Sequence, residues 1–176
     1  MRRASKCFCS GVLFLTTFHF LGAQISPRLQ KKINTAITTT YGVAAFELRE
    51  VSTELEELSL DGDSLFEIVQ DTEQLGYLYL GEAPSMKQVF DYIVMFDPDI
   101  TIKKSKVLIY REDYGQQIGS QRWLKQFIGL SVTDVPMYSE NIDAIAGATI
   151  SAKNMTDAVG NVLKKMGVLK EKQVLP

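Results

Sequence analysis

Residues 89–96, Val-Phe-Asp-Tyr-Ile-Val-Met-Phe, are apolar or aromatic at nearly every position. A strand with so little polar alternation is expected to be buried on both of its faces. The turn signal Asp-Pro-Asp follows at 97–99, and residues 100–102 and 106–110 can return as an antiparallel partner. The sequence therefore predicts a hairpin over residues 89–110, with a central strand buried within the domain.

Helical patterns lie on either side of this strand-rich middle. Apolar residues at three- and four-residue spacing predict helices over residues 27–40, 121–128 and 150–166, with Gly167 as the stop signal of the last. Two more strands are expected over residues 65–69 and 75–80, followed by chain breaks at Gly81 and Pro84. Within residues 43–60, Phe46, Leu48 and Val51 suggest a short strand, whereas the run at 54–57 allows a helical turn. Residues 132–142 fit a loop. The order of elements predicts an α+β fold, an antiparallel sheet flanked by helices, in a single domain.

The N-terminus has the composition of a secretory signal. Arg2, Arg3 and Lys6 precede an apolar run at 11–21, and Leu-Gly-Ala at 21–23 suits a cleavage site. The run is shorter than the roughly 20 residues that span a membrane, and it contains His19. We expect residues 1–23 to be removed on export to the periplasm or another extracytoplasmic space. An uncleaved membrane anchor is the alternative.

Cleavage would also remove every cysteine and histidine of the chain, namely Cys7, Cys9 and His19. A chain without these residue types has no cysteine nucleophile, no Ser-His-Asp triad, no disulfide and no zinc or iron–sulfur site with the usual ligands. The mature chain would carry 16 Lys and Arg against 21 Asp and Glu. This mildly acidic balance argues against binding to a nucleic-acid backbone.

The segment Asp-Ala-Ile-Ala-Gly-Ala-Thr at 143–149 opens directly onto the last predicted helix. The free amides of a first helical turn and the positive end of the helix dipole favour an anion, so Thr149 could present its hydroxyl to a phosphate. Threonine is also a common N-cap. The residues alone therefore leave two readings of Thr149, an ordinary cap and part of a phosphate site.

Segment 143–149 resembles the flavinylation motif Asp-x-x-Ser/Thr-Gly-Ala-Thr of FMN-binding domains, which include the C subunit of the sodium-translocating NADH:quinone reductase and the G subunit of the Rnf complex. In that family, a separate flavin transferase that uses FAD and magnesium esterifies the last threonine to the phosphate of FMN. The resemblance implies that Thr149 carries covalent FMN. It also implies that the transferase recognises Asp143, Gly147 and Ala148. Ala146 departs from the pattern, because the family usually has serine or threonine there.

A second block of similarity lies upstream. Tyr-Arg-Glu-Asp-Tyr-Gly at 110–115 and Trp-Leu-Lys-Gln-Phe-Ile-Gly at 123–129 look like the family's Glu-Thr-Pro-Gly-Leu-Gly loop and its segment ending in Gln-Phe-x-Gly, without the proline and the glycine-rich loop. The resemblance covers about 76–167 and implies a division into an N-terminal helix and strands at 24–75, an FMN-binding region at 76–170 and a tail at 171–176.

The upstream block contains four candidate flavin contacts. Trp123 and Tyr114 could stack near the isoalloxazine ring, and Arg111 or Lys125 could stabilise the anionic reduced flavin. Each has an alternative reading, because aromatic residues are commonly part of a core and exposed basic residues are commonly solvated. No catalytic side chain is required, since the flavin itself stores one or two electrons.

Three functions remain open at this point. The leading hypothesis is an exported electron-transfer flavoprotein, a redox carrier rather than an independent enzyme, whose electron donor and acceptor are associated with the membrane. The second is a non-flavinylated binding module of the same fold, which Ala146 keeps open. The third is a membrane-anchored subunit of a redox-driven ion pump, which the short N-terminal apolar run disfavours.

Overall fold

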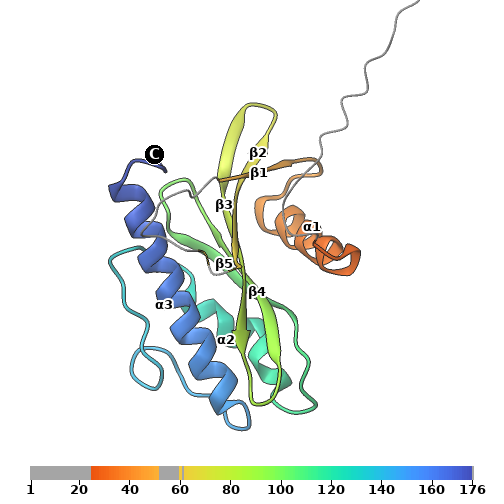
Figure 1. Cartoon of the computed structure of the whole chain (residues 1–176), viewed down its shortest axis with the longest axis vertical. Coiled ribbons are helices and arrows are strands. Elements are labelled where there is room, and N and C mark those ends of the chain that lie inside the picture. The colour runs from red at the N-terminus through yellow and green to blue at the C-terminus, as the bar shows by residue number, and fades with distance from the viewer. Residues whose placement is uncertain (1–24, 52–59, 61, 176) are drawn as a thin grey trace, which may run out of the picture.

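The computed structural model describes residues 25–51, 60 and 62–175. These residues form an antiparallel sheet with the strand order β1-β2-β3-β4-β5. The strands are β1 Glu47–Glu50, β2 Ser64–Gln70, β3 Glu73–Pro84, β4 Val89–Phe96 and β5 Ile102–Ile109. Helix α1 (Pro27–Tyr41) covers one face of the sheet and helix α3 (Thr149–Glu171) covers the other (Figure 1). The predicted α+β fold is confirmed.

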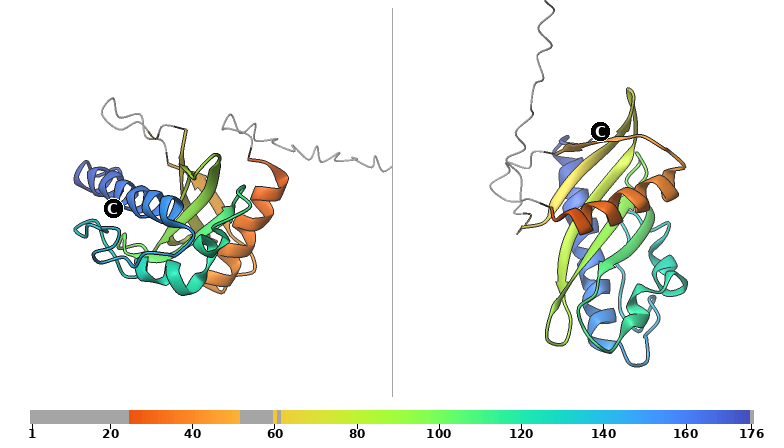
Figure 2. Two further views of the ribbon diagram at one scale, coloured as in Figure 1. Left: turned by 90° about the horizontal axis from the view of Figure 1, so that it is seen from below. Right: turned by 90° about the vertical axis from the view of Figure 1, so that its right-hand side faces the viewer.

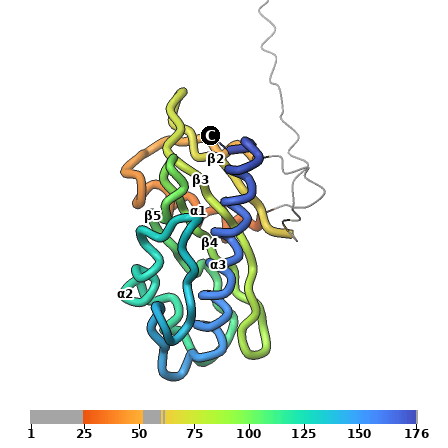
Figure 3. The backbone as a smooth tube through the Cα atoms, turned by 90° about the vertical axis from the view of Figure 1, so that its left-hand side faces the viewer, coloured from red at the N-terminus to blue at the C-terminus, as the bar shows by residue number. Residues whose placement is uncertain are grey.

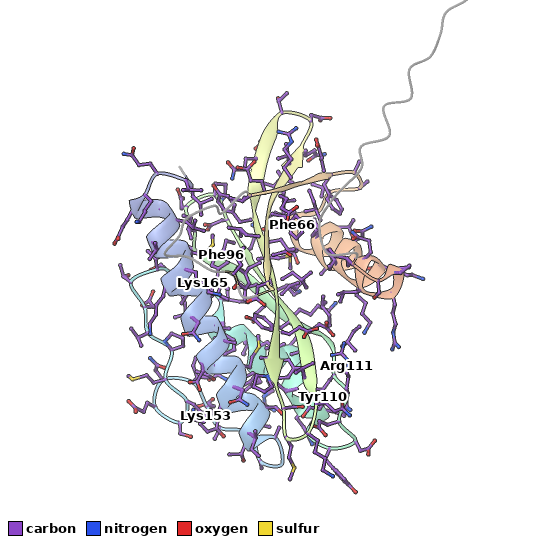
Figure 4. The ribbon with its side chains drawn as sticks, viewed as in Figure 1. Phe66, Phe96, Tyr110, Arg111, Lys153 and Lys165 are labelled. Carbon is purple, nitrogen blue, oxygen red and sulfur yellow. The ribbon has the colours of Figure 1, made fainter. Side chains whose placement is uncertain are left out.

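Strand β4 is the buried centre that the sequence predicts. It pairs with β3 on one side and β5 on the other, and every residue after Val89 is buried. Its side chains alternate between two apolar clusters. Phe96 belongs to the cluster beneath α3, whereas Phe66 of the neighbouring β2 belongs to the cluster beneath α1 (Figure 4). The predicted hairpin over residues 89–110 is therefore confirmed.

The connection from β5 to α3 packs on the same face of the sheet as α3 (Figures 2 and 3). It contains a 3-10 turn η1 (Gln116–Gly119), a short helix α2 (Gln121–Leu124) and a second 3-10 turn η2 (Lys125–Phe127). Ile118, Trp123 and Phe127 reach the core beneath α3. The helix predicted at 121–128 thus exists as α2 followed by η2, and the loop predicted at 132–142 is also confirmed.

Two predicted breaks are wrong. Strand β3 continues through Gly81, which pairs with Tyr92 of β4. A Cβ atom at Gly81 would lie 2.8 Å from the Tyr92 hydroxyl oxygen, so the missing side chain makes room for this tyrosine. Helix α3 continues through Gly167 to Glu171, because Leu169 is fully buried and keeps this turn against the core.

Some expectations fall on parts of the chain that the structure does not describe. The predicted signal at 1–23 and the possible helical turn at 54–57 lie outside the described residues, and the signal stays a prediction. Within residues 25–51, 60 and 62–175, no helix combines the length and the apolar character needed to cross a membrane.

Candidate functional site

Thr149 is the first residue of α3 and not its N-cap. The N-cap is Ala148, whose side chain cannot accept a hydrogen bond from the first turn. The Thr149 side chain is exposed, and its hydroxyl has no hydrogen-bond partner within the described chain. Thr149 is therefore not the N-cap of α3, and its hydroxyl is exposed without a partner among the described residues.

The backbone around Thr149 is suited to an anion. The first intrahelical bond runs from the Ala152 N–H to the Ala148 carbonyl at 2.8 Å, so the amides of residues 149–151 precede the helical ladder. The first turn contains no acidic residue that would compete for the positive end of the dipole. Apart from the adjacent residues, no described atom lies within 4 Å of the position that a Cβ atom would occupy at Gly147. These features fit a phosphate group at the start of α3.

A cavity of about 430 Å³ opens beside this helix start. Its size lies in the range of small-molecule sites. Its walls come from the β3–β4 turn, the segment after β5 and the start of α3, and the lining residues are Met86, Lys87, Tyr110, Glu112, Asp113, Tyr114 and residues 147–151. The region between Gly147 and Ser151 thus faces a cavity large enough for a cofactor.

Tyr110 joins the end of β5 to the first turn of α3. Its hydroxyl oxygen lies 2.9 Å from Oγ of the buried Ser151, and its ring packs near Phe90. The absence of a side chain at Gly115 lets its backbone approach both Tyr110 and Gly147. A Cβ atom there would lie 2.8 Å from the Tyr110 hydroxyl oxygen and 3.3 Å from the Gly147 carbonyl oxygen. These contacts hold the two sequence blocks against each other. Figure 4 shows Tyr110 at the end of the sheet beside the start of α3.

Glu112 fixes the wall of the cavity that the β3–β4 turn forms. Its Oε1 accepts hydrogen bonds from the Ser85 hydroxyl at 2.6 Å, the Lys87 N–H at 2.5 Å and the Gln88 N–H at 2.9 Å. The bond from Ser85, followed by that from the Lys87 amide, holds the pKa of the Glu112 carboxyl below its ordinary value. Glu112 therefore positions the turn as a carboxylate and is not placed as an acid–base catalyst.

Residues of α2 and η2 form hydrogen bonds with Asp143, the first residue of the 143–149 segment. The Trp123 indole Nε1–H donates to the Asp143 carbonyl oxygen at 2.7 Å, and the Asp143 N–H donates to Oε1 of Gln126 at 2.9 Å. Asp143 is exposed, and no described residue pairs with its carboxylate. Both the N–H and the carbonyl group of Asp143 are therefore held by hydrogen bonds, while its side chain stays exposed.

The structure brings some of the predicted site residues together and separates others. Gly147, Ala148 and Thr149 line the cavity with Tyr114, whose side chain is 85% exposed. Trp123 lies in the core, where its ring is perpendicular to that of Phe127 at 5.3 Å. This placement suits the core reading of Trp123.

The two predicted basic contacts lie outside the cavity lining. Arg111, which Figure 4 labels, forms an ion pair with the buried Asp91 at 2.7 Å. It also donates to the Val89 carbonyl oxygen at 2.9 Å. Lys125 is exposed on η2. The basic residue among those lining the cavity is instead Lys87. Nothing in the local sequence singled out Lys87, because the β3–β4 turn meets the α3 start only in the folded chain.

The fold and the cavity together define an α+β domain with a cofactor-sized site at the start of its long helix. Residues 86–164 match the family model described as the FMN-binding domain. This part of the chain belongs to the FMN-binding domain family. The match supports FMN binding and a flavin-dependent electron-transfer role. No curated protein matches the chain significantly.

Proposed function

We propose that this protein is an exported electron-transfer flavoprotein whose FMN is esterified through its phosphate to Thr149. The proposal depends above all on the exposed, unbonded Thr149 hydroxyl at the start of α3, beside the cavity of an FMN-binding domain. The proposed relatives in function are the C subunit of the sodium-translocating NADH:quinone reductase and the G subunit of the Rnf complex.

The attachment requires a separate flavin transferase with FAD and magnesium. The Thr149 oxygen forms a bond to the FMN-side phosphorus of FAD, the pyrophosphate bond to AMP breaks, and the hydroxyl proton passes to solvent. No electron is transferred in this step. The accessible Asp143 carboxylate, with Gly147 and Ala148, is the proposed recognition surface for the transferase.

Within the domain, the protein's own residues position and tune the cofactor. The free amides of residues 149–151 receive the phosphate, and Tyr114 offers an exposed ring at the cavity. Lys87 supplies positive charge at the turn that Glu112 holds in place. When bound, the flavin supplies one- or two-electron chemistry. We propose that its donor and acceptor are membrane-associated redox proteins.

The decisive experiment is production in an exporting host that contains a flavin transferase. We expect the intact mass of the mature chain to exceed its sequence mass by FMN less one water, and the flavin to stay with the chain under denaturing conditions. Thr149→Ala should abolish both signals. Thr133→Ala, at another exposed threonine, should leave both unchanged. Flavin that stays covalently attached to the Thr149→Ala chain would exclude the proposal.

Ala146 supports a second candidate, a binding module that kept the fold without covalent flavin. Incubation of the purified chain with FAD, magnesium and a flavin transferase separates the two functions. A Thr149 that stays unmodified, in both the native chain and an Ala146→Ser variant, would favour the binding module. Modification of the Ala146→Ser variant alone would identify residue 146 as a requirement of the transferase.

A further inference from the structure

A second cavity, of about 340 Å³, lies between the N-terminal half of α1 and strand β5. We call it the basic groove, because four of its seven lining residues are cationic. Its lining consists of Arg28, Lys31, Lys32, Thr35, Lys106, Val107 and Leu108. None of these residues lines the flavin cavity, and α1 lies on the face of the sheet opposite α3 (Figure 2).

Among the described residues, no carboxylate forms an ion pair that would offset the positive charge of the basic groove. Within the described chain, neither Arg28, Lys31, Lys32 nor Lys106 forms an ion pair with a carboxylate. In the described part of the chain, the side chain of Lys32 donates to the Leu108 carbonyl oxygen. This concentration of charge stands out because the whole chain has a net charge of −2.

The lysines of the groove also repel one another. Burial, and then the positive charges of Lys104 and Lys32, lower the pKa of Lys106. Crowded like charges destabilise a folded protein unless an anion offsets them. A groove of this size and charge suits a phosphate group, which the guanidinium of Arg28 and the ammonium groups can contact together.

We propose that the basic groove docks the protein onto a membrane by binding the phosphate groups of anionic phospholipids. The chain favours this source of phosphate because of where α1 begins. Pro27 lies six residues after the apolar run at 11–21, so the chain between them spans at most about 20 Å. A basic cluster this close to a hydrophobic segment reaches the lipid headgroups whenever that segment is in the membrane. The inference rests on the alternative in which residues 1–23 are retained and the apolar run stays in the membrane, and it does not depend on flavinylation.

The test measures binding of the full chain to vesicles of phosphatidylcholine, with and without phosphatidylglycerol, by co-sedimentation. The N-terminal segment, with Arg2, Arg3 and Lys6, is the same in the native chain and in the variants, so a difference between them on the anionic vesicles reports the groove. We expect phosphatidylglycerol to strengthen binding. The triple variant Arg28→Gln, Lys31→Gln, Lys106→Gln should lose about fivefold per residue, or roughly a hundredfold in total.

A matched variant, Arg122→Gln, Lys164→Gln, Lys170→Gln, removes the same charge from other exposed sites and should bind much as the native chain does. Because the groove variant relieves repulsion, its thermal midpoint should not fall, which shows that it is folded. Equal loss of binding in both variants would reduce the effect to net charge and overturn the proposal. Chemical acylation of Lys106 gives a second measurement. The proposal would also be overturned if inorganic phosphate protected Lys106 from acylation and phosphatidylglycerol vesicles did not.

Discussion

The substitution Trp123→Phe tests whether Trp123 holds the 143–149 segment or contacts the flavin. It removes the hydrogen bond from the indole N–H to the Asp143 carbonyl oxygen, which is 2.7 Å long in the structure. A hydrogen bond of this kind contributes about 1 kcal/mol to the free energy of unfolding. The lost part of the indole leaves a space in a site that is only 7% exposed, which costs about 1–2 kcal/mol more.

We therefore expect the free energy of unfolding to fall by about 2–3 kcal/mol, and the thermal midpoint by about 5–10 °C for a domain of this size. Calorimetry and urea unfolding of the unmodified protein measure the loss. The control Arg122→Gln changes the exposed neighbour of Trp123 and should shift stability by less than about 0.5 kcal/mol.

The flavin-loaded protein supplies the second readout. A residue that only positions the loop should leave the absorption maxima and the reduction potential of the flavin unchanged. A stacked ring should alter both. A stability loss below about 0.5 kcal/mol together with a shifted reduction potential would refute the core role of Trp123 and favour its role as a flavin contact.

Two further substitutions test the supports of the cavity. Arg111→Gln leaves the buried Asp91 carboxylate without its cation and should cost about 2 kcal/mol, less than for a fully buried pair because the Arg111 side chain is 35% exposed; Asp91→Asn in the same chain should recover much of the loss in urea unfolding. Glu112→Gln should destabilise the β3–β4 turn at neutral pH. Because the folded-state pKa of Glu112 is lowered, its stabilisation is present above about pH 4.5 and is lost as the pH falls through the folded value, so thermal midpoints of native and variant chains should converge in acid.

The fold was predictable where hydrophobic patterns are local. The nearly continuous apolar run of β4 and the apolar spacing in α1 and α3 each reflect burial on a defined face. The predictions at Gly81 and Gly167 were wrong because each glycine was read as the end of an element. Gly81 instead makes room for Tyr92 within the sheet, and the buried Leu169 keeps the helix going past Gly167. Tyr92 lies on the neighbouring strand β4, and the burial of Leu169 is set by packing across the core, so a short window of sequence shows neither effect.

The sequence points to Thr149, the proposed FMN acceptor, but does not show the contacts that support the site. Thr149 was found because its motif is contiguous. The hydrogen bonds that Asp143 accepts from Trp123 and donates to Gln126 join residues 20 and 17 positions apart, and Glu112 accepts bonds from residues 24 to 27 positions before it. Such contacts depend on how the β5–α3 connection folds over the sheet. The sequence could therefore name Trp123 as important without showing that it acts through the loop.

The position of Thr149 leads to a prediction that needs no cofactor. Ala148 gives α3 no side-chain cap and the first turn has no acidic residue, so the positive end of the helix is unopposed. A negative charge at residue 149 should then stabilise the helix by about 0.5–1 kcal/mol at low salt.

Thr149→Glu and Thr149→Gln isolate this charge, since the two residues have nearly equal size and helix propensity. We expect Thr149→Glu to be the more stable variant in urea unfolding, with the difference shrinking as salt screens the exposed charge. Equal stability at low salt would mean that the start of α3 does not favour an anion, and would remove the electrostatic reason for placing a phosphoester there. A confirmed difference would mean that the same helix start that presents the hydroxyl also stabilises the modified product.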